Sequence, residues 1–103
     1  MLTQPAAIKI AADWARASDD PEVVCFYDAG DVQANGFQIV EDDRLGRTHT
    51  ETGASYMGFA VSALLATAVS DPPFYGLALT GDGSFTMSPQ ILIDGVQQGA
   101  RGC

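Results

Sequence analysis

An apolar run at residues 74–79 stops at Gly81-Asp82-Gly83, and the polar segment that follows restarts as a helix. Two prolines precede the run and the glycines follow it, a pattern typical of a strand buried on both faces. A strand, a tight glycine turn and a helix make half of a βαβ unit. Open α/β sheets bind ligands at the carboxyl ends of their strands, and Asp82 is predicted to lie at such an end.

The Gly-Asp-Gly turn favours a particular kind of ligand. Glycines let backbone amides approach a phosphate closely, but the Asp82 carboxylate would repel a bare phosphate. A divalent cation between the two removes the conflict, and Mg²⁺ commonly takes one or two carboxylates together with phosphate oxygens. Asp-Gly is also common in hairpin turns, so the tripeptide alone leaves a plain turn open. Ser88 followed by Pro89 instead predicts a capped helix after the turn.

The rest of the chain alternates helix and strand. Residues 3–17 predict an amphipathic helix, and residues 23–27 a second apolar strand that ends at Asp28-Ala29-Gly30-Asp31. Residues 32–52 predict a long irregular connection. Residues 53–58, which begin and end with glycine, are predicted to open a helix that runs to about residue 69. Residues 101–103 are predicted to approach another strand. The residues predicted to face inward are Ala7, Ile10, Ala11, Trp14 and Ala17 in the first helix, Val61, Leu64 and Leu65 in the next, and Ile91, Leu92 and Val96 in the last. Two strands with similar ends predict a parallel sheet.

Composition excludes several classes of function. The chain has 103 residues, which suits one domain (1–103), and its 5 basic and 13 acidic residues give a net charge of −8. Nucleic acids and anionic membrane surfaces are therefore poor partners. Residues 59–69 are too short to span a bilayer, and the start lacks the pattern of a signal peptide. Cys25 and Cys103 form no disulfide framework or zinc motif, so we expect a reducing, cytoplasmic setting.

Two side chains before residue 53 are candidates for acid–base chemistry. His49 is the sole histidine of the chain and can titrate near neutral pH. Glu51 lies two residues further along. For each of them, an ordinary surface or packing role is the alternative to a catalytic one.

Residues 79–87 resemble the opening of the thiamine diphosphate signature in the diphosphate-binding domain of decarboxylases and acetolactate synthase-like enzymes. The order of parts agrees, with Asp28-Ala29-Gly30 after the first strand, residues 53–58 before a helix, and then the aspartate turn. Residues 49–59 look most like the trihydroxycyclohexanedione hydrolases within that group. The resemblance implies an α/β fold with a three-layer, doubly wound parallel sheet that is incomplete at the C-terminus.

The resemblance also implies roles for individual positions. Asp82 would ligate Mg²⁺, and the backbone at Ser55 and Met57 would meet the aminopyrimidine ring of thiamine diphosphate. Gly30 and Asp31 would lie near the outer phosphate. The full set of implied cofactor-binding residues is Gly30, Asp31, Gly53, Ser55, Tyr56, Met57, Gly81, Asp82, Gly83 and Ser84.

Parts of the family pattern lie outside this chain. The signature closes with paired asparagines on the next strand, one of them a metal ligand, and the activating glutamate belongs to a separate pyrimidine-binding domain. The resemblance therefore implies the N-terminal portion of a cofactor-binding domain. It would be inactive alone and would work with a pyrimidine-binding domain or subunit, in a homo- or hetero-oligomer, on a small carbonyl substrate.

Two readings of the function remain open. The first is Mg²⁺-dependent thiamine diphosphate binding within an enzyme that cleaves or forms carbon–carbon bonds next to a carbonyl. Such an enzyme would be a 2-oxo acid decarboxylase, an acetolactate synthase-like transferase or a cyclic diketone hydrolase. The second is a non-catalytic assembly or regulatory subunit that keeps the fold without the cofactor. A dinucleotide-binding domain is disfavoured because no G-x-G-x-x-G follows the first strand.

Overall fold

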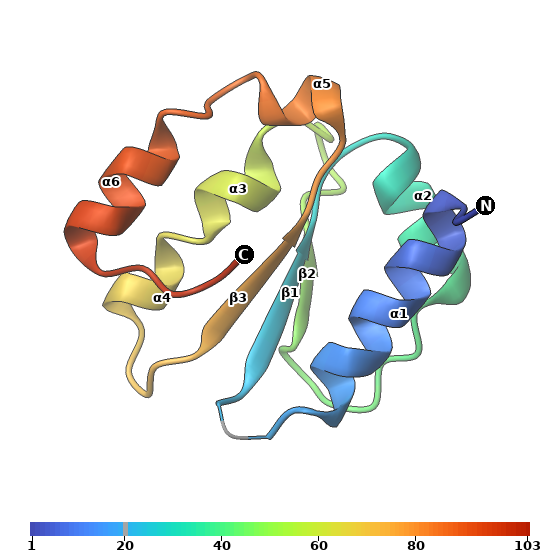
Figure 1. Cartoon of the computed structure of the whole chain (residues 1–103), viewed down its shortest axis with the longest axis horizontal. Helices are drawn as coiled ribbons and strands as arrows, with labels where there is room; N and C mark the ends of the chain where they lie inside the picture. Colours follow the sequence, from blue (N-terminus) through green and yellow to red (C-terminus); the bar gives the residue numbers. More distant parts are fainter. Residues whose placement is uncertain (20) are drawn as a thin grey trace.

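The computed structural model describes residues 1–19 and 21–103. These residues form an α/β fold with a parallel sheet (Figure 1). The sheet has three strands in the order β2-β1-β3, all parallel, and Cys25 on the central strand pairs with Thr48 on one side and Leu77 on the other. The predicted fold class is confirmed. In chain order the elements are α1 (Gln4–Ala17), β1 (Val23–Tyr27), α2 (Asp31–Ile39), β2 (Thr48–Thr50), α3 (Phe59–Ala63), α4 (Ala66–Val69), β3 (Tyr75–Leu79), α5 (Asp82–Phe85) and α6 (Ile91–Gln98).

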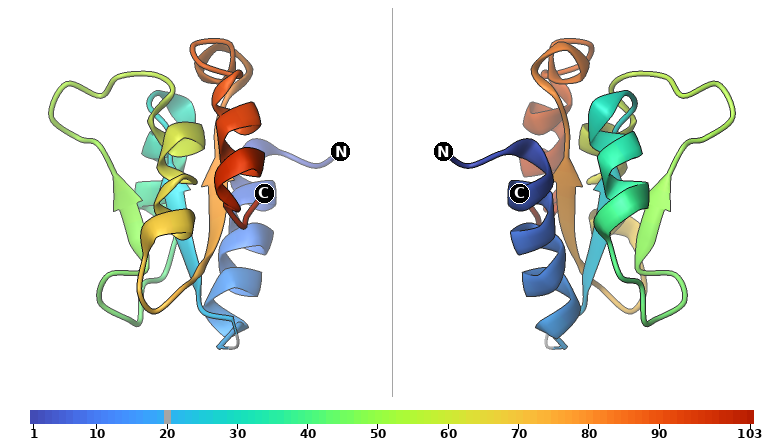
Figure 2. Two further views of the ribbon diagram at one scale, coloured as in Figure 1. Left: turned by 90° about the vertical axis from the view of Figure 1, so that its left-hand side faces the viewer. Right: turned by 90° about the vertical axis from the view of Figure 1, so that its right-hand side faces the viewer.

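Helices cover both faces of the sheet. In the right view of Figure 2, α1 and α2 lie in front of the strands, and in the left view α3, α4 and α6 do. Every residue of β1 is buried, because side chains alternate between the faces of a strand and both faces are covered here. Cys25 and Tyr27 enter the core beneath α1 and α2, whereas Val24 and Phe26 pack with Ala60 of α3.

The chain order creates a switch point at the carboxyl ends of β1 and β3. From β1 the chain passes through α2 to β2 on one side, and from β2 it crosses through α3 and α4 to β3 on the other side. The loops after two neighbouring strands therefore diverge, and such a divergence opens a crevice in doubly wound sheets. As predicted, residues 101–103 approach the sheet beside β3: Gly102 forms an isolated parallel bridge with Gly76, and the amide of Ala78 donates to a backbone oxygen of Cys103 at 2.7 Å.

The first helix begins as the sequence predicts but buries a different stripe. The Thr3 side chain accepts a hydrogen bond from the amide of Ala6 and caps α1. The buried residues of α1 are Ile8, Ala12 and Ala15; of the predicted stripe, Ala11 packs against the core, but the stripe as a whole is not the buried face. Ile10 is 63% exposed and Trp14 is 54% exposed, although the Trp14 ring still meets Tyr75 edge-on at 6.4 Å. The alanines of α1 lie on two adjacent faces of the helix, so their spacing alone allows either face to be buried. Contact with the sheet determines which of the two is buried.

The prediction of an irregular connection over residues 32–52 is also wrong. The segment contains most of α2 and all of β2. Asn35-Gly36 resembles a turn signal, yet Gly36 lies inside α2, where a β-carbon would come within 3.0 Å of the Tyr27 ring. The glycine therefore allows the helix to lie close to the sheet, and this packing overrides its low helix propensity.

The helices after β2 and β3 are shorter than expected. Residues 53–58 form an open loop, and the predicted single helix consists of α3 and α4 separated by Leu64 and Leu65. Ser88 does not cap α6 through its side chain; its carbonyl accepts from the amide of Ile91 at 3.1 Å in a tight turn. Of the residues of α6 predicted to face inward, Ile91 is partly buried, whereas Leu92 is 43% and Val96 82% exposed, so the prediction is wrong for these two.

The turn predicted at residues 18–21 includes Asp20, which lies outside the described residues. Within the described residues, no helix is both long enough and apolar enough to cross a membrane.

The close packing of α3 and α4 on β3 gives a first testable prediction. A β-carbon on Gly76 would lie 2.7 Å from Leu64 Cδ2 and 3.1 Å from Thr67 Cγ2. We expect Gly76→Ala to lower the free energy of unfolding by about 1–3 kcal/mol, as overpacking does. Gly81→Ala is the matched control, because a β-carbon there meets nothing within 4 Å. Urea unfolding of both variants tests this, and equal losses would contradict the packing.

Candidate functional site

Three loops meet at the carboxyl edge of the sheet and hold every residue predicted to bind the cofactor. They follow β1 (residues 28–31), β2 (residues 51–58) and β3 (residues 80–84, which run into α5). In Figure 1 the start of α2 and α5 lie at the end toward which the strand arrows point. We call this edge the rim. Residues far apart in the sequence are thus brought to one place.

One buried carboxylate ties the three loops together. Asp28 is fully buried at the end of β1. Its Oδ1 accepts hydrogen bonds from the amides of Ala29 at 2.9 Å and Gly58 at 3.0 Å. Its Oδ2 accepts from the amide of Ala60 at 3.3 Å and from Thr80 Oγ1 at 3.0 Å. A carboxylate offers acceptors alone, so all four donors are matched and the loops after β2 and β3 are fixed to the end of β1.

The loop after β2 lies directly against the aspartate turn. A β-carbon on Gly83 would come within 3.2 Å of Met57 Cε, and one on Gly58 would come within 3.2 Å of Met87 Cβ. Gly58 also has a φ of 99°, a conformation that favours glycine, where the loop turns into α3. The glycines therefore permit a contact between the methionine segment and the turn that larger residues would prevent.

Asp82 is exposed and begins α5. Its Oδ1 accepts from the amide of Gly83 at 2.9 Å. The turn does not lead into a hairpin, because α5 follows Gly81 immediately. The neighbouring Ser84 is buried. Over residues 1–19 and 21–103, no cluster of three or more His, Cys, Asp or Glu side chains is placed to hold a metal.

Gly30 and Asp31 lie at the start of α2. Gly30 has a φ of 87°, and a β-carbon there would meet nothing within 4 Å, so glycine is needed for the backbone and not for space. Asp31 is the exposed first residue of the helix. Together with Glu51 and Asp82, these residues make the rim acidic.

Glu51 is engaged with its own loop. Its carboxylate accepts from the amides of Gly53 at 2.7 Å, Ala54 at 3.1 Å and Tyr56 at 3.4 Å. Gln33 of α2 donates to the carbonyl of Glu51 at 3.0 Å and to Thr50 Oγ1 at 2.6 Å. The end of β2 is thereby attached to α2, and the loop is folded around the glutamate.

His49 faces a different part of the molecule. Its ring stacks on Phe26 with centroids 5.8 Å apart, and Nε2 lies 2.9 Å from the carbonyl oxygen of Gly46. It lines a groove on the α3–α4 face together with Phe26 and Phe59. A catalytic role for His49 stays a prediction.

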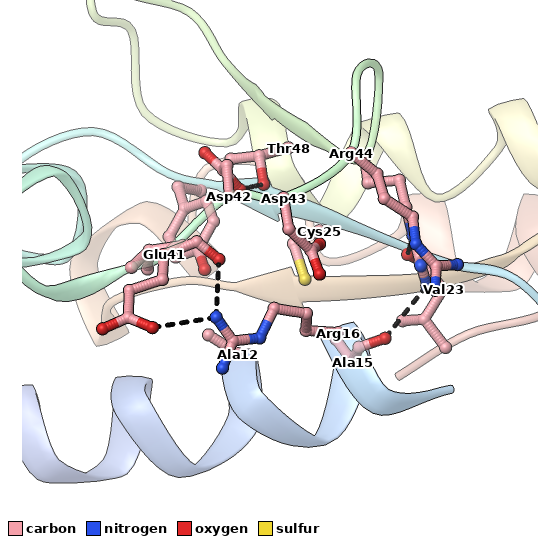
Figure 3. A pocket seen from close by; sticks show the side chains of 13 residues that line it. Ala12, Ala15, Arg16, Val23, Cys25, Glu41, Asp42, Asp43, Arg44 and Thr48 are labelled. Atoms are coloured by element: carbon pink, nitrogen blue, oxygen red, sulfur yellow. Dashed lines mark hydrogen bonds and ion pairs between the residues drawn. The ribbon is translucent and has the colours of Figure 1, made fainter. Parts of the chain in front are cut away.

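A small cavity on the α1–α2 face of the sheet has a structural role (Figure 3). Arg16 donates to Glu41 Oε2 at 2.9 Å across it. The buried Arg47 donates to the carbonyls of Val23 at 3.0 Å and Ser18 at 2.7 Å. Burial raises the pKa of the Cys25 thiol in its wall to about 11, so the thiol stays neutral and unreactive. These contacts hold α1 to the strands.

Comparison with known proteins identifies the family. The profile described as "Thiamine pyrophosphate enzyme, C-terminal TPP binding domain" matches residues 28–101, from the buried aspartate to the segment after α6. The chain belongs to the thiamine pyrophosphate enzyme family. Thiamine pyrophosphate is the cofactor that we call thiamine diphosphate.

Two curated relatives carry a more specific name. Both are 3D-(3,5/4)-trihydroxycyclohexane-1,2-dione hydrolases of Clostridium perfringens, from strain 13 and strain ATCC 13124, and both are 26% identical to this chain over 98 residues. The match covers 95% of this chain and 15% of each relative. The chain thus spans a small part of the length of these enzymes.

The rim of this thiamine diphosphate-binding domain fits a magnesium-bound diphosphate. β-Carbons at Gly30 and Gly81 would meet nothing within 4 Å, so there is open space beside both loops. The Asp82 carboxylate is exposed at that space, and one carboxylate with phosphate oxygens and water suits Mg²⁺.

Two residues that organise the domain's rim were not predicted as site residues. Asp28 follows a wholly apolar strand, and a charged residue at the buried end of such a strand is the available signal. Gln33 offers no comparable signal, because its partners Thr50 and Glu51 lie 17 and 18 residues away in the sequence.

The Asp28 contacts give a second prediction. In Asp28→Asn, an NH₂ group replaces one acceptor and faces N–H or O–H donors. We expect the free energy of unfolding to fall by about 2–3 kcal/mol, because buried donors lose a charged acceptor. Asp43→Asn is the control, since Asp43 is exposed and should change stability by less than about 0.5 kcal/mol. If the two variants are equally stable in urea, the rim does not depend on the buried carboxylate.

Proposed function

We propose that this domain binds thiamine diphosphate through Mg²⁺ and serves an enzyme that cleaves or forms a carbon–carbon bond next to a carbonyl. The observation that carries the proposal is the closeness of Met57 to the Gly-Asp-Gly turn, where a β-carbon on Gly83 would lie 3.2 Å from Met57 Cε. It supports a single site in which one segment meets the cofactor's ring and the other its diphosphate.

Each rim segment has a distinct task in this proposal. Asp82 holds the metal, and the amides of Gly83 and Ser84 bind the diphosphate. Gly30 and Asp31 lie beside the outer phosphate, where Gly30 leaves space. The backbone at Ser55 and Met57 holds the aminopyrimidine ring, with Gly53 and Tyr56 completing that loop. The buried Asp28 holds these segments in position relative to one another.

The chemistry comes from the cofactor, which supplies a carbon nucleophile and then an electron sink for the broken bond. The protein binds and orients it. A pyrimidine-binding domain or partner subunit completes the site, and a small carbonyl compound is the substrate. The names of the relatives favour hydrolysis of a cyclic diketone over decarboxylation of a 2-oxo acid.

A calorimetric titration with thiamine diphosphate tests the proposal in the native assembly. We expect binding in the presence of Mg²⁺ and its loss in EDTA. Asp82→Ala should weaken binding by about a hundredfold or more, since even residues that orient metal ligands contribute about 10- to 100-fold. Asp94→Ala, an exposed carboxylate on α6, is the control. If wild-type protein binds no cofactor, the alternative function, a non-catalytic assembly or regulatory subunit, is favoured instead. If binding is unchanged in EDTA, the cofactor binds without a metal and that part of the proposal is wrong.

A further inference from the structure

The carboxylate of Glu51 reaches forward around its own loop. Oε1 accepts from the amides of Gly53 at 2.7 Å and Ala54 at 3.1 Å, and Oε2 accepts from the amide of Tyr56 at 3.4 Å. Between these donors, Ser55 has a φ of 52°, a left-handed conformation that costs free energy for a residue with a side chain. The carboxylate therefore holds a turn that the backbone alone disfavours.

Both ends of this loop are fixed to the sheet. Gln33 donates to the carbonyl of Glu51 at 3.0 Å, and Thr50 Oγ1 donates to the carbonyl of Tyr27 at 2.9 Å. At the other end, the amide of Gly58 donates to Asp28. The loop is thus suspended between two fixed points, and the Glu51 carboxylate organises the residues between them.

The electrostatics of the loop agree with this arrangement. Partial burial raises the pKa of the Glu51 carboxyl, but hydrogen bonds from the amides of residues 53–56 lower it by more, and the net pKa lies below its usual range. The group is ionised at neutral pH and occupied as an acceptor. A carboxylate held in this way is a poor proton carrier, so we assign Glu51 a role other than acid–base catalysis.

We propose that Glu51 is a positioning residue that sets the backbone of residues 53–57 for the cofactor's pyrimidine ring. The proposal rests on the proposed function, because it assigns Glu51 a role in the same site. Glu51 acts through the loop and does not touch the reacting atoms.

Gly53 offers a way to remove the contact without changing the glutamate. A β-carbon on Gly53 would come within 2.8 Å of Glu51 Oε1, the end of a flexible side chain. The φ of Gly53 is not positive, so alanine fits the backbone and the carboxylate has to move. Gly53→Ala should therefore reproduce the effect of Glu51→Ala, and the double variant should be little worse than either one.

The experiment measures two quantities in the native assembly. The first is amide hydrogen exchange of residues 53–56 without cofactor, and the second is the Kd for thiamine diphosphate with Mg²⁺. We expect Glu51→Ala and Gly53→Ala to speed exchange and to raise the Kd about tenfold or more, as loss of charge-assisted hydrogen bonds does. Glu51→Gln, which keeps an acceptor, should recover part of the affinity.

The control is Glu41→Gln, which removes a surface ion pair with Arg16 and should leave both quantities unchanged. If wild-type protein binds the cofactor and Glu51→Ala binds it equally well, the role of Glu51 is overturned while the proposed function stands. If the effects of Glu51→Ala and Gly53→Ala multiply in the double variant, they act independently and the proposal is also overturned. If wild-type protein binds no cofactor, the proposed function fails and the role of Glu51 fails with it.

Discussion

A buried carboxylate joins the parts of the cofactor rim. Asp28 lies where β1 ends, and its oxygens accept from the start of α3 and from Thr80 after β3. A buried charge is costly unless it is fully hydrogen-bonded, so the surrounding backbone has little freedom to choose another arrangement. The loops that carry Met57 and Asp82 inherit their relative position from this one group. The loops at the switch point are thereby held together by hydrogen bonds within the domain itself.

The rest of the rim explains how an acidic domain can take an anionic cofactor. Asp31, Glu51 and Asp82 lie on the three loops of the rim, and the chain carries a net charge of −8. Glu51 is neutralised in part by backbone amides, and Asp28 is enclosed. Asp82 remains exposed beside Gly81, where a cation can join it to a diphosphate. Each carboxylate of the rim thus has a separate task, set by its surroundings.

Local pattern predicted β1, β3 and the turn after β3 better than the helices. The all-buried β1 and the glycine-bounded turn carry strong local signals, because apolar runs and glycines report burial and tight turns directly. The buried stripe of α1 and the existence of α2 depend on contacts with the sheet, such as Gly36 against Tyr27, which no local pattern contains. The Asp28 network joins residues up to 52 positions apart, so only the three-dimensional structure reveals its role.

The most direct test is a crystal structure of the native assembly with thiamine diphosphate and Mn²⁺ in place of Mg²⁺. The anomalous signal of manganese locates the metal independently of the cofactor. The account predicts a manganese peak bound by the Asp82 carboxylate, with the aminopyrimidine ring against the backbone of Ser55 and Met57. A manganese peak or a cofactor ring bound away from these two segments would contradict it.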